Sequence, residues 1–151
     1  MREVGPADAT LTVKTYREGV AAKVGHDLVI VVTNWSAKIG DDGAVVLSAD
    51  PRSLEVREGL RGAKPPSDRD RREILKNIEQ KVLGTQPIEF RGTADGGELT
   101  MAGATRPVTI ERTADGGRAT LTQSQWGIKP YRGLMGALKV RDDVEVIVSG
   151  L

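Results

Sequence analysis

The sequence predicts a mainly β domain, an antiparallel barrel of about eight strands covered by one α-helix. Three observations support this prediction. Short strand-like segments recur between turn signals, only one segment has helical spacing, and no strand–helix–strand crossover pattern occurs. A barrel is favoured over a sandwich because closure removes exposed sheet edges. The 151 residues match the size of one domain, so we expect residues 1–151 to fold as a single unit.

Two segments of the first part of the chain have the strongest strand patterns. Residues 9–15 alternate, with Leu11 and Val13 on one face and polar residues on the other. Residues 28–39 are apolar on both faces, with Val29, Val31 and Trp35 assigned to the same face. Two interpretations of this segment stay open. One face lines an interior while a helix covers the other, or the segment is the central strand of a sandwich core.

The only predicted helix covers residues about 68–83. Ser67 offers an N-cap hydroxyl, and Gly84 supplies a left-handed stop. Between them, apolar residues recur at helical spacing: Ile74, Leu75, Ile78, Val82 and Leu83. Before this helix, the turn signal at 41–43 separates residue 39 from short strands predicted at 44–50 and 53–56.

A small internal repeat predicts two hairpins in the second half. The sequence Thr-Ala-Asp-Gly-Gly occurs at 93–97 and again at 113–117, between strand-like runs. Residues 88–93 are therefore expected to pair with 98–102, and residues 108–113 with 118–124. The last strand is predicted at 144–149.

Composition argues against several functional classes. Lys and Arg total 22 against 21 for Asp and Glu, so the net charge of +1 supplies no strong field for nucleic acid. No cysteine and no G-x-S-x-G motif is present, and the single histidine, His26, has no partner at metal-ligand spacing. We predict no catalytic residue, no metal and no cofactor. A turn role for His26 and an acid–base role both stay open.

Hydropathy predicts a cytoplasmic protein. The first residues lack the apolar region of a secretion signal. No segment offers the roughly 20 apolar residues that span a bilayer. The oligomeric state is open, and a homodimer is compatible with the sequence.

Several signatures make the chain resemble the YceI-like family, small bacterial proteins associated with polyisoprenoid and other lipid-like ligands. The resemblance covers nearly all of the chain, in the variant with a Gly-His-Asp-Leu signature. It is carried by 25–28, 50–54, 87–90, 99–108, 123–131 and 135–140. It implies an extended lipocalin-like barrel with an apolar channel. One departure is the tight turn between Phe90 and Leu99, where the family usually has a longer hairpin, so we expect a shorter channel.

Alternation and the resemblance together give the candidate ligand site. The predicted wall and mouth residues are apolar: Val29, Val31, Trp35, Ile78, Val82, Phe90, Leu99, Met101, Trp126, Leu134 and Met135. The predicted contacts to a polar headgroup are His26, Lys129 and Tyr131. We expect noncatalytic binding, carriage or sensing of a polyisoprenoid or similar lipid. Two alternatives stay open, a filled barrel that acts in protein interaction or stress response, and an enzyme on a lipid-like substrate that uses His26.

Overall fold

The computed structural model describes most of the chain. The described residues are 1–15, 17–18, 28–59, 72, 75–76, 79, 84, 86–128, 132–133, 138–140 and 142–151. Of residues 17–18, 28, 58–59, 132–133 and 138–140, the structure describes the backbone alone.

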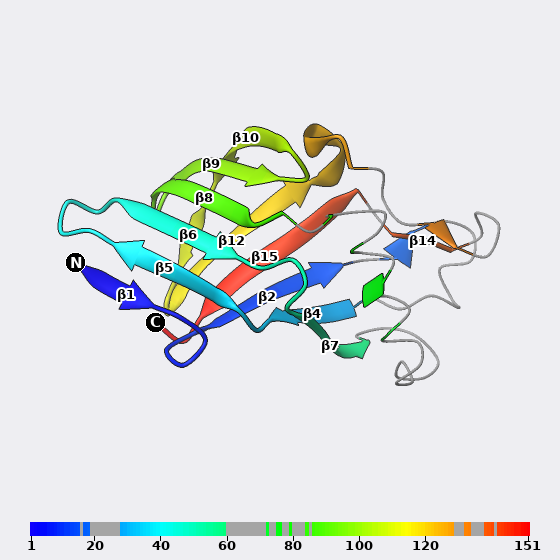
Figure 1. The fold of residues 1–151 in the computed structure, drawn as a ribbon, viewed down its shortest axis with the longest axis horizontal. Coiled ribbons are helices and arrows are strands. Elements are labelled where there is room, and N and C mark those ends of the chain that lie inside the picture. The colour runs from blue at the N-terminus through cyan, green and yellow to red at the C-terminus, as the bar shows by residue number, and fades with distance from the viewer. Residues whose placement is uncertain are drawn as a thin grey trace.

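Two six-stranded antiparallel sheets form the body of the protein (Figure 1). The first sheet has the order β1(Arg2–Val4), β5(Trp35–Ile39), β6(Val45–Ala49), β8(Ile88–Thr93), β9(Gly96–Met101), β10(Ala104–Thr109). The second has the order β11(Glu111–Thr113), β12(Gly116–Thr122), β15(Asp143–Ser149), β2(Thr10–Thr15), β4(Leu28–Val32), β7(Leu54–Gly59). A small third sheet joins β13(Arg132–Gly133), β14(Leu138–Val140) and β3(Arg17–Glu18).

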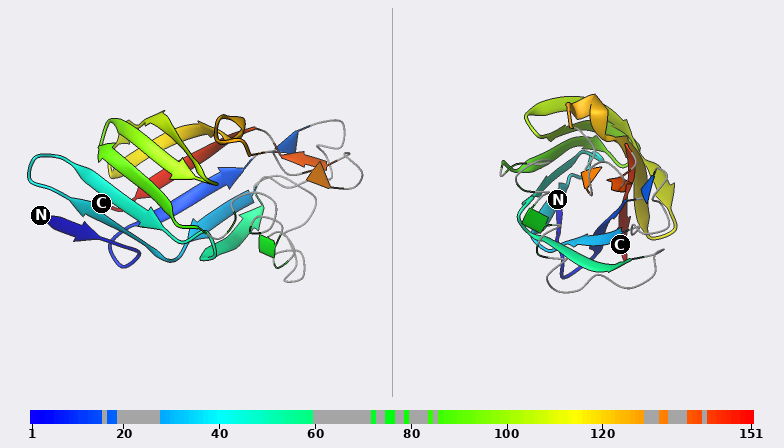
Figure 2. Two further views of the ribbon diagram at one scale, coloured as in Figure 1. Left: turned by 45° about the horizontal axis from the view of Figure 1, so that its top comes forward. Right: turned by 90° about the vertical axis from the view of Figure 1, so that its right-hand side faces the viewer.

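The two large sheets curve round the long axis of the molecule (Figure 2). The chain passes directly from one sheet to the other between β4 and β5, between β7 and β6, and between β10 and β11. Ladder pairs within the described part do not join the sheets into a closed ring. The mainly β, antiparallel prediction is therefore confirmed, whereas the closed barrel is not observed in this part of the chain.

A bend divides the segment that the sequence predicts as one strand at 28–39. The backbone N–H and the hydroxyl of Thr33 donate to the carbonyl of Ser53, at 2.8 and 2.7 Å. The N–H of Asn34 donates to the Ser53 hydroxyl at 3.0 Å, and its carbonyl accepts from the N–H of Asp50. These bonds link the break between β4 and β5 to the break between β6 and β7. The single long strand is thus wrong, because two strands bend together at this point.

The Asp-Gly repeats behave largely as predicted. β8 pairs with β9 across Thr93 and Gly96, and β11 pairs with β12 across Thr113 and Gly116. The turn residues are the Ala-Asp pairs at 94–95 and 114–115, while the glycines begin the next strands. The predicted pairing of 108–113 with 118–124 holds only for Glu111 and Arg118, because residues 104–109 pair with β9 and residues 117–122 pair with β15. Pro107 fits β10 because that strand lies at the edge of its sheet.

The predicted helix at 68–83 falls mostly outside the described residues. Arg72, Leu75 and Lys76 have helical backbone, and Leu75 packs against the buried pair Ile30 and Val56. The covering helix therefore stays a prediction. In the described part of the chain, no helix is long and apolar enough to cross a membrane.

Candidate functional site

Cross-strand register defines the inner face of the second sheet. Val146, Val13, Ile30 and Val56 lie opposite one another on four neighbouring strands, β15, β2, β4 and β7. Ile30 and Val56 are buried. Side chains alternate between the two faces of a strand, so this row marks the face directed toward the first sheet.

Three groups of buried side chains lie on the inner faces. The N-terminal cluster consists of Val4, Ala9, Leu11, Val32, Trp35, Ala37 and Ala49. The Trp126 cluster consists of Met101, Leu121, Trp126, Ile128 and Val144. The third group is the Ile30–Val56 pair. Each group packs against further apolar residues that are only partly buried.

Four of these partly buried residues connect the three groups, and we call them the central lining. Val13 packs against all three groups, whereas Ile88 and Val146 each pack against the two larger clusters. Leu54 packs against the N-terminal cluster and the Ile30–Val56 pair. All four keep solvent-accessible surface although they lie between buried groups. These four side chains therefore offer accessible aliphatic surface between the buried groups.

The two tryptophans differ in the hydrogen bonding of their indole N–H groups. The Nε1–H of Trp126 donates to the carbonyl of Leu99 at 2.9 Å, which fixes the 3-10 helix η2(Gln123–Trp126) against β9. The Nε1 atom of Trp35 is buried and has no hydrogen-bond partner among the described residues, as is also true of the Thr15 hydroxyl. The interior therefore contains two polar atoms whose hydrogen bonds the described protein groups do not supply.

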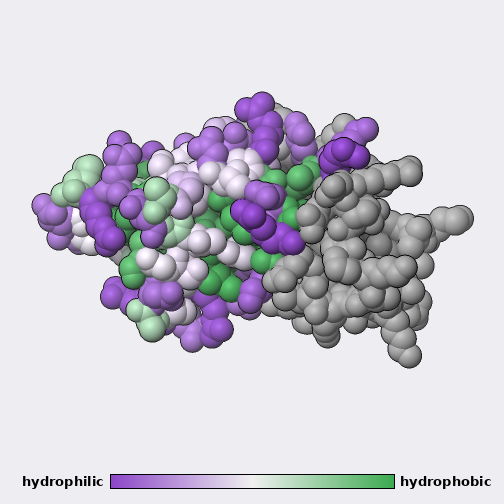
Figure 3. Space-filling view, turned by 90° about the horizontal axis from the view of Figure 1, so that it is seen from below, coloured by the Kyte–Doolittle hydropathy of each residue, from purple (hydrophilic) through white to green (hydrophobic). Residues whose placement is uncertain are grey.

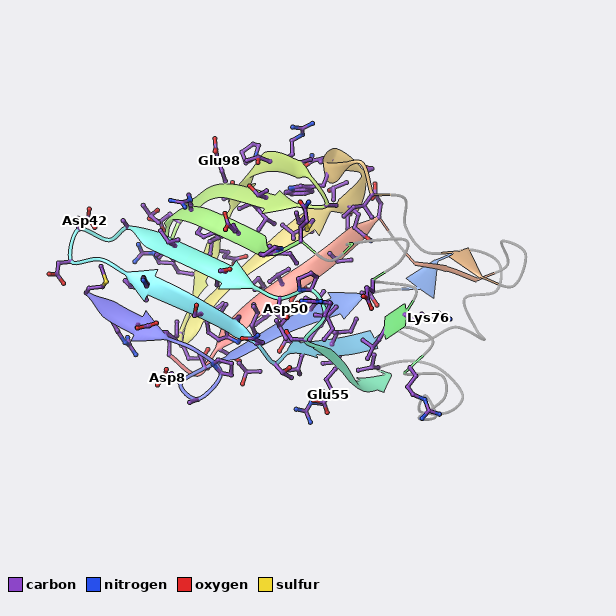
Figure 4. The ribbon with its side chains drawn as sticks, in the orientation of Figure 1. Asp8, Asp42, Asp50, Glu55, Lys76 and Glu98 are labelled. Carbon is purple, nitrogen blue, oxygen red and sulfur yellow. The ribbon has the colours of Figure 1, made fainter. Side chains whose placement is uncertain are left out.

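Charged residues lie on the outside of the sheets. Asp42, Glu55 and Glu98 point away from the space between the sheets (Figure 4). Seen from below, hydrophobic surface is visible in a band between hydrophilic residues (Figure 3). The central lining is aliphatic and carries no titratable group, so its chemistry suits apolar contact.

Two ion pairs stabilise the strands on either side of the β10–β11 junction. Arg112 donates to both carboxylate oxygens of Asp95, at 2.8 and 3.1 Å, and the Asp95 carbonyl accepts from the N–H of Ile110. Arg118 donates to Glu111 at 2.9 Å. Hydrogen bonds to these carboxylates, followed by their charges, raise the pKa of Arg112 and of Arg118 above the ordinary arginine value. Both pairs are exposed, so they do not form a buried site.

The structure brings together four of the predicted ligand-site residues: Phe90, Leu99, Met101 and Trp126. Phe90 lies directly opposite Leu99, and Leu99 packs against the cluster that contains Met101 and Trp126. Trp35 also points inward but belongs to the N-terminal cluster. Their roles in ligand binding stay predictions.

Val29 and Val31 lie on the opposite face of β4 from the buried Ile30. Their cross-strand neighbours include Lys14 for Val29 and both Thr12 and Glu55 for Val31. This placement corrects the predicted grouping with Trp35, because the bend at 33–34 shifts the alternation by one residue. The remaining predicted site residues lie outside the described part: His26, Ile78, Val82, Lys129, Tyr131, Leu134 and Met135.

Sequence reasoning did not assign the central lining to the site. Val13 could have been assigned from the sequence, since it alternates with polar neighbours and this pattern indicates that its side chain points inward. The other three residues, Ile88, Leu54 and Val146, could not be assigned in this way. The inner face of their strands depends on the register with distant strands, which no local pattern reveals. Within the described residues, no group of three or more His, Asp or Glu side chains is placed to hold a metal ion.

Comparisons with known proteins find likeness among solved structures. No family model matches the sequence, and no curated protein matches it. Among solved structures, the chain is similar to a polyisoprenoid-binding domain from Saccharophagus degradans implicated in plant cell wall breakdown. The two are 9% identical, with a TM-score of 0.43, over 95% of this chain and 94% of that one. This likeness does not show membership of a family, so the resemblance to the YceI-like family stays a prediction.

Proposed function

We propose that this protein binds a long-chain apolar molecule, a polyisoprenoid or a similar lipid, between its two sheets and carries or senses it without catalysis. The observation that carries the proposal is the accessible surface of the central lining, Val13, Leu54, Ile88 and Val146. An aliphatic surface that stays accessible between buried clusters is suited to a ligand that gains free energy by leaving water.

The magnitude of the hydrophobic gain suits reversible binding. About ten methylene-sized groups leaving water contribute roughly 0.8 kcal/mol each, or about 8 kcal/mol before the costs of ordering are subtracted. The aliphatic character of the lining supports binding over chemistry, because general acid–base catalysis needs a titratable group at the reacting atom.

A matched pair of substitutions tests the proposal. Val13→Phe adds volume to the central lining, whereas Val29→Phe adds the same volume on the outer face of the neighbouring strand. Binding is measured with the fluorescent probe N-phenyl-1-naphthylamine and by its displacement with geranylgeraniol. We expect Val13→Phe to weaken binding by at least about tenfold, or about 1.4 kcal/mol, and Val29→Phe to leave it unchanged.

The same variants separate an open interior from a filled barrel. Adding a ring to a filled core costs about 1–3 kcal/mol of unfolding free energy, whereas an open interior accepts the ring at lower cost. Denaturant unfolding of both variants measures this difference. Wild-type protein that binds neither the probe nor geranylgeraniol, together with a strongly destabilised Val13→Phe, would contradict the proposal and favour the filled barrel.

A further inference from the structure

The described strand pairs leave a gap between β10 of the first sheet and β12 of the second. β11 pairs with β12 from Thr113 and Gly116 to Glu111 and Arg118, and the pairing ends there. Beyond that point β10 pairs with β9 alone, and residues 119–122 of β12 pair with β15 alone. Two unpaired strand edges therefore diverge from the Glu111–Arg118 pair.

A pocket of about 370 Å³ occupies this divergence, and we call it the slot. Its lining comes from both edges and from η2: Pro107, Val108, Thr109, Glu111, Arg118, Ala119, Thr120, Gln125 and Trp126. The 3-10 helix lies beside the end of β10 (Figure 1). The slot is thus bounded by the Glu111–Arg118 ion pair at one end and by η2 at the other.

The slot is lined by residues from both faces of the sheet. Thr120 lies opposite Glu145 and belongs to the outer face. Ala119 lies opposite Val146 of the central lining and belongs to the inner face, and Val108 packs against the Trp126 cluster. The slot therefore reaches Val108 and Ala119, two partly exposed residues that pack against the Trp126 cluster.

The edges of the slot are poorly suited to receive another β-strand. Pro107 has no N–H group to donate. Arg106 donates from Nη1 to the carbonyl of Thr105, and its Nε donates to the carbonyl of Gln125 at 2.9 Å. Strand addition needs free backbone donors and acceptors along an edge, so a small molecule fits this opening better than a peptide.

We infer that the slot is a lateral entry site through which the apolar chain of the ligand passes between β10 and β12 to the central lining. The inference rests on the proposed function. The threonine and arginine groups at the outer rim stay in water, while Val108, Ala119 and Trp126 offer apolar contact to a chain as it enters. Blocking the slot should therefore change the rates of binding and release without changing the equilibrium.

A single engineered cysteine tests the inference because the chain contains no cysteine. Thr120→Cys places the thiol at the outer rim of the slot, and Ser48→Cys places a control thiol on the exposed outer side of β6. Each variant is coupled to a maleimide-linked polyethylene glycol. Stopped-flow fluorescence of N-phenyl-1-naphthylamine then gives the association and dissociation rates. The unlabelled variant Ala119→Leu narrows the slot from its inner side.

Coupled Thr120→Cys should bind and release the probe at least about tenfold more slowly than coupled Ser48→Cys, with the same dissociation constant. Ala119→Leu should slow both rates in the same direction. Equal rates in all variants overturn the entry site while leaving the proposed function standing. If the Ser48→Cys control and the wild type bind no probe, the proposed function fails, and the entry site fails with it.

Discussion

The two tryptophans provide a matched test of the core described above. Trp35 and Trp126 are buried to almost the same extent, with 4% and 3% of their surfaces exposed. Substitution by phenylalanine removes the same indole portion at each site, so the loss of apolar contact is similar. The two variants therefore differ mainly in what happens to one N–H group.

The expected difference follows from the hydrogen bonds. Trp126→Phe removes the 2.9 Å bond to the carbonyl of Leu99, a loss of about 1 kcal/mol. Trp35→Phe removes a buried donor that has no partner among the described residues, and such a donor costs about 1–3 kcal/mol in the native state. Trp126→Phe should therefore be less stable than Trp35→Phe by about 2–4 kcal/mol.

Urea unfolding followed by far-ultraviolet circular dichroism measures both free energies independently of the tryptophan signal. Equal destabilisation, or a larger loss for Trp35→Phe, would rule out these roles of the two indole N–H groups. Such a result would mean that the indole N–H of Trp35 has a partner in solution, or that the Trp126 bond contributes nothing.

Three further predictions concern the hairpins and the edges of the sheets. Gly116→Ala should lower the unfolding free energy by about 1–3 kcal/mol in urea titrations, because a Cβ there would overlap the carbonyl oxygen of Val148. Asp115→Ala should speed hydrogen exchange at the amide of Gly150, which donates to the Asp115 carboxylate. The amide of Leu151 donates to the backbone carbonyl of Asp115 and should keep its exchange rate. The hydrogen bond to Glu111 raises the pKa of Arg118. The ion pair therefore contributes to stability at every pH below the ordinary arginine pKa, and this contribution is lost only as the pH rises through the raised pKa. Arg118→Gln should consequently shift the melting temperature equally at about pH 6.5 and about pH 9, and a shift that vanishes at the higher pH would contradict this assignment.

Local signals in the sequence predicted the hairpins well. The Thr-Ala-Asp-Gly-Gly repeats mark both turns, since the geometry of a tight turn depends on a few adjacent residues. Asp95 and Asp115 have a second role that sequence patterns do not show, because each binds groups far along the chain. The turn itself was predictable, whereas its attachment to the rest of the fold was not.

Long-range contacts explain the predictions that failed. The bend at 33–34 depends on hydrogen bonds to Ser53 and Asp50, which lie on the other side of a hairpin. Because the bend shifts the alternation, Val29 was grouped with Trp35 although the two lie on different faces. β10 was not predicted as a strand of its own, and Pro107 fits there because the strand lies at the edge of its sheet.

The candidate site also contains residues that the sequence predicted and residues that only the structure reveals. Phe90, Leu99, Met101 and Trp126 were predicted as wall or mouth residues. Register places Phe90, Leu99 and Met101 on the inner face of the first sheet, and Trp126 packs with Met101 from η2. The central lining emerges only when both sheets are placed together, because Val13 gains its neighbours from three separate clusters. Alternation predicts which residues share a face, but only tertiary structure shows which of them remain accessible.

The proposed binding is tested most directly by mass spectrometry of solvent extracts from protein purified from its native host. The extract should contain one long-chain apolar molecule per protein chain, and stripped protein should take up geranylgeraniol in the same ratio. Protein that is repeatedly empty, and that takes up no geranylgeraniol after stripping, would rule out the proposed binding.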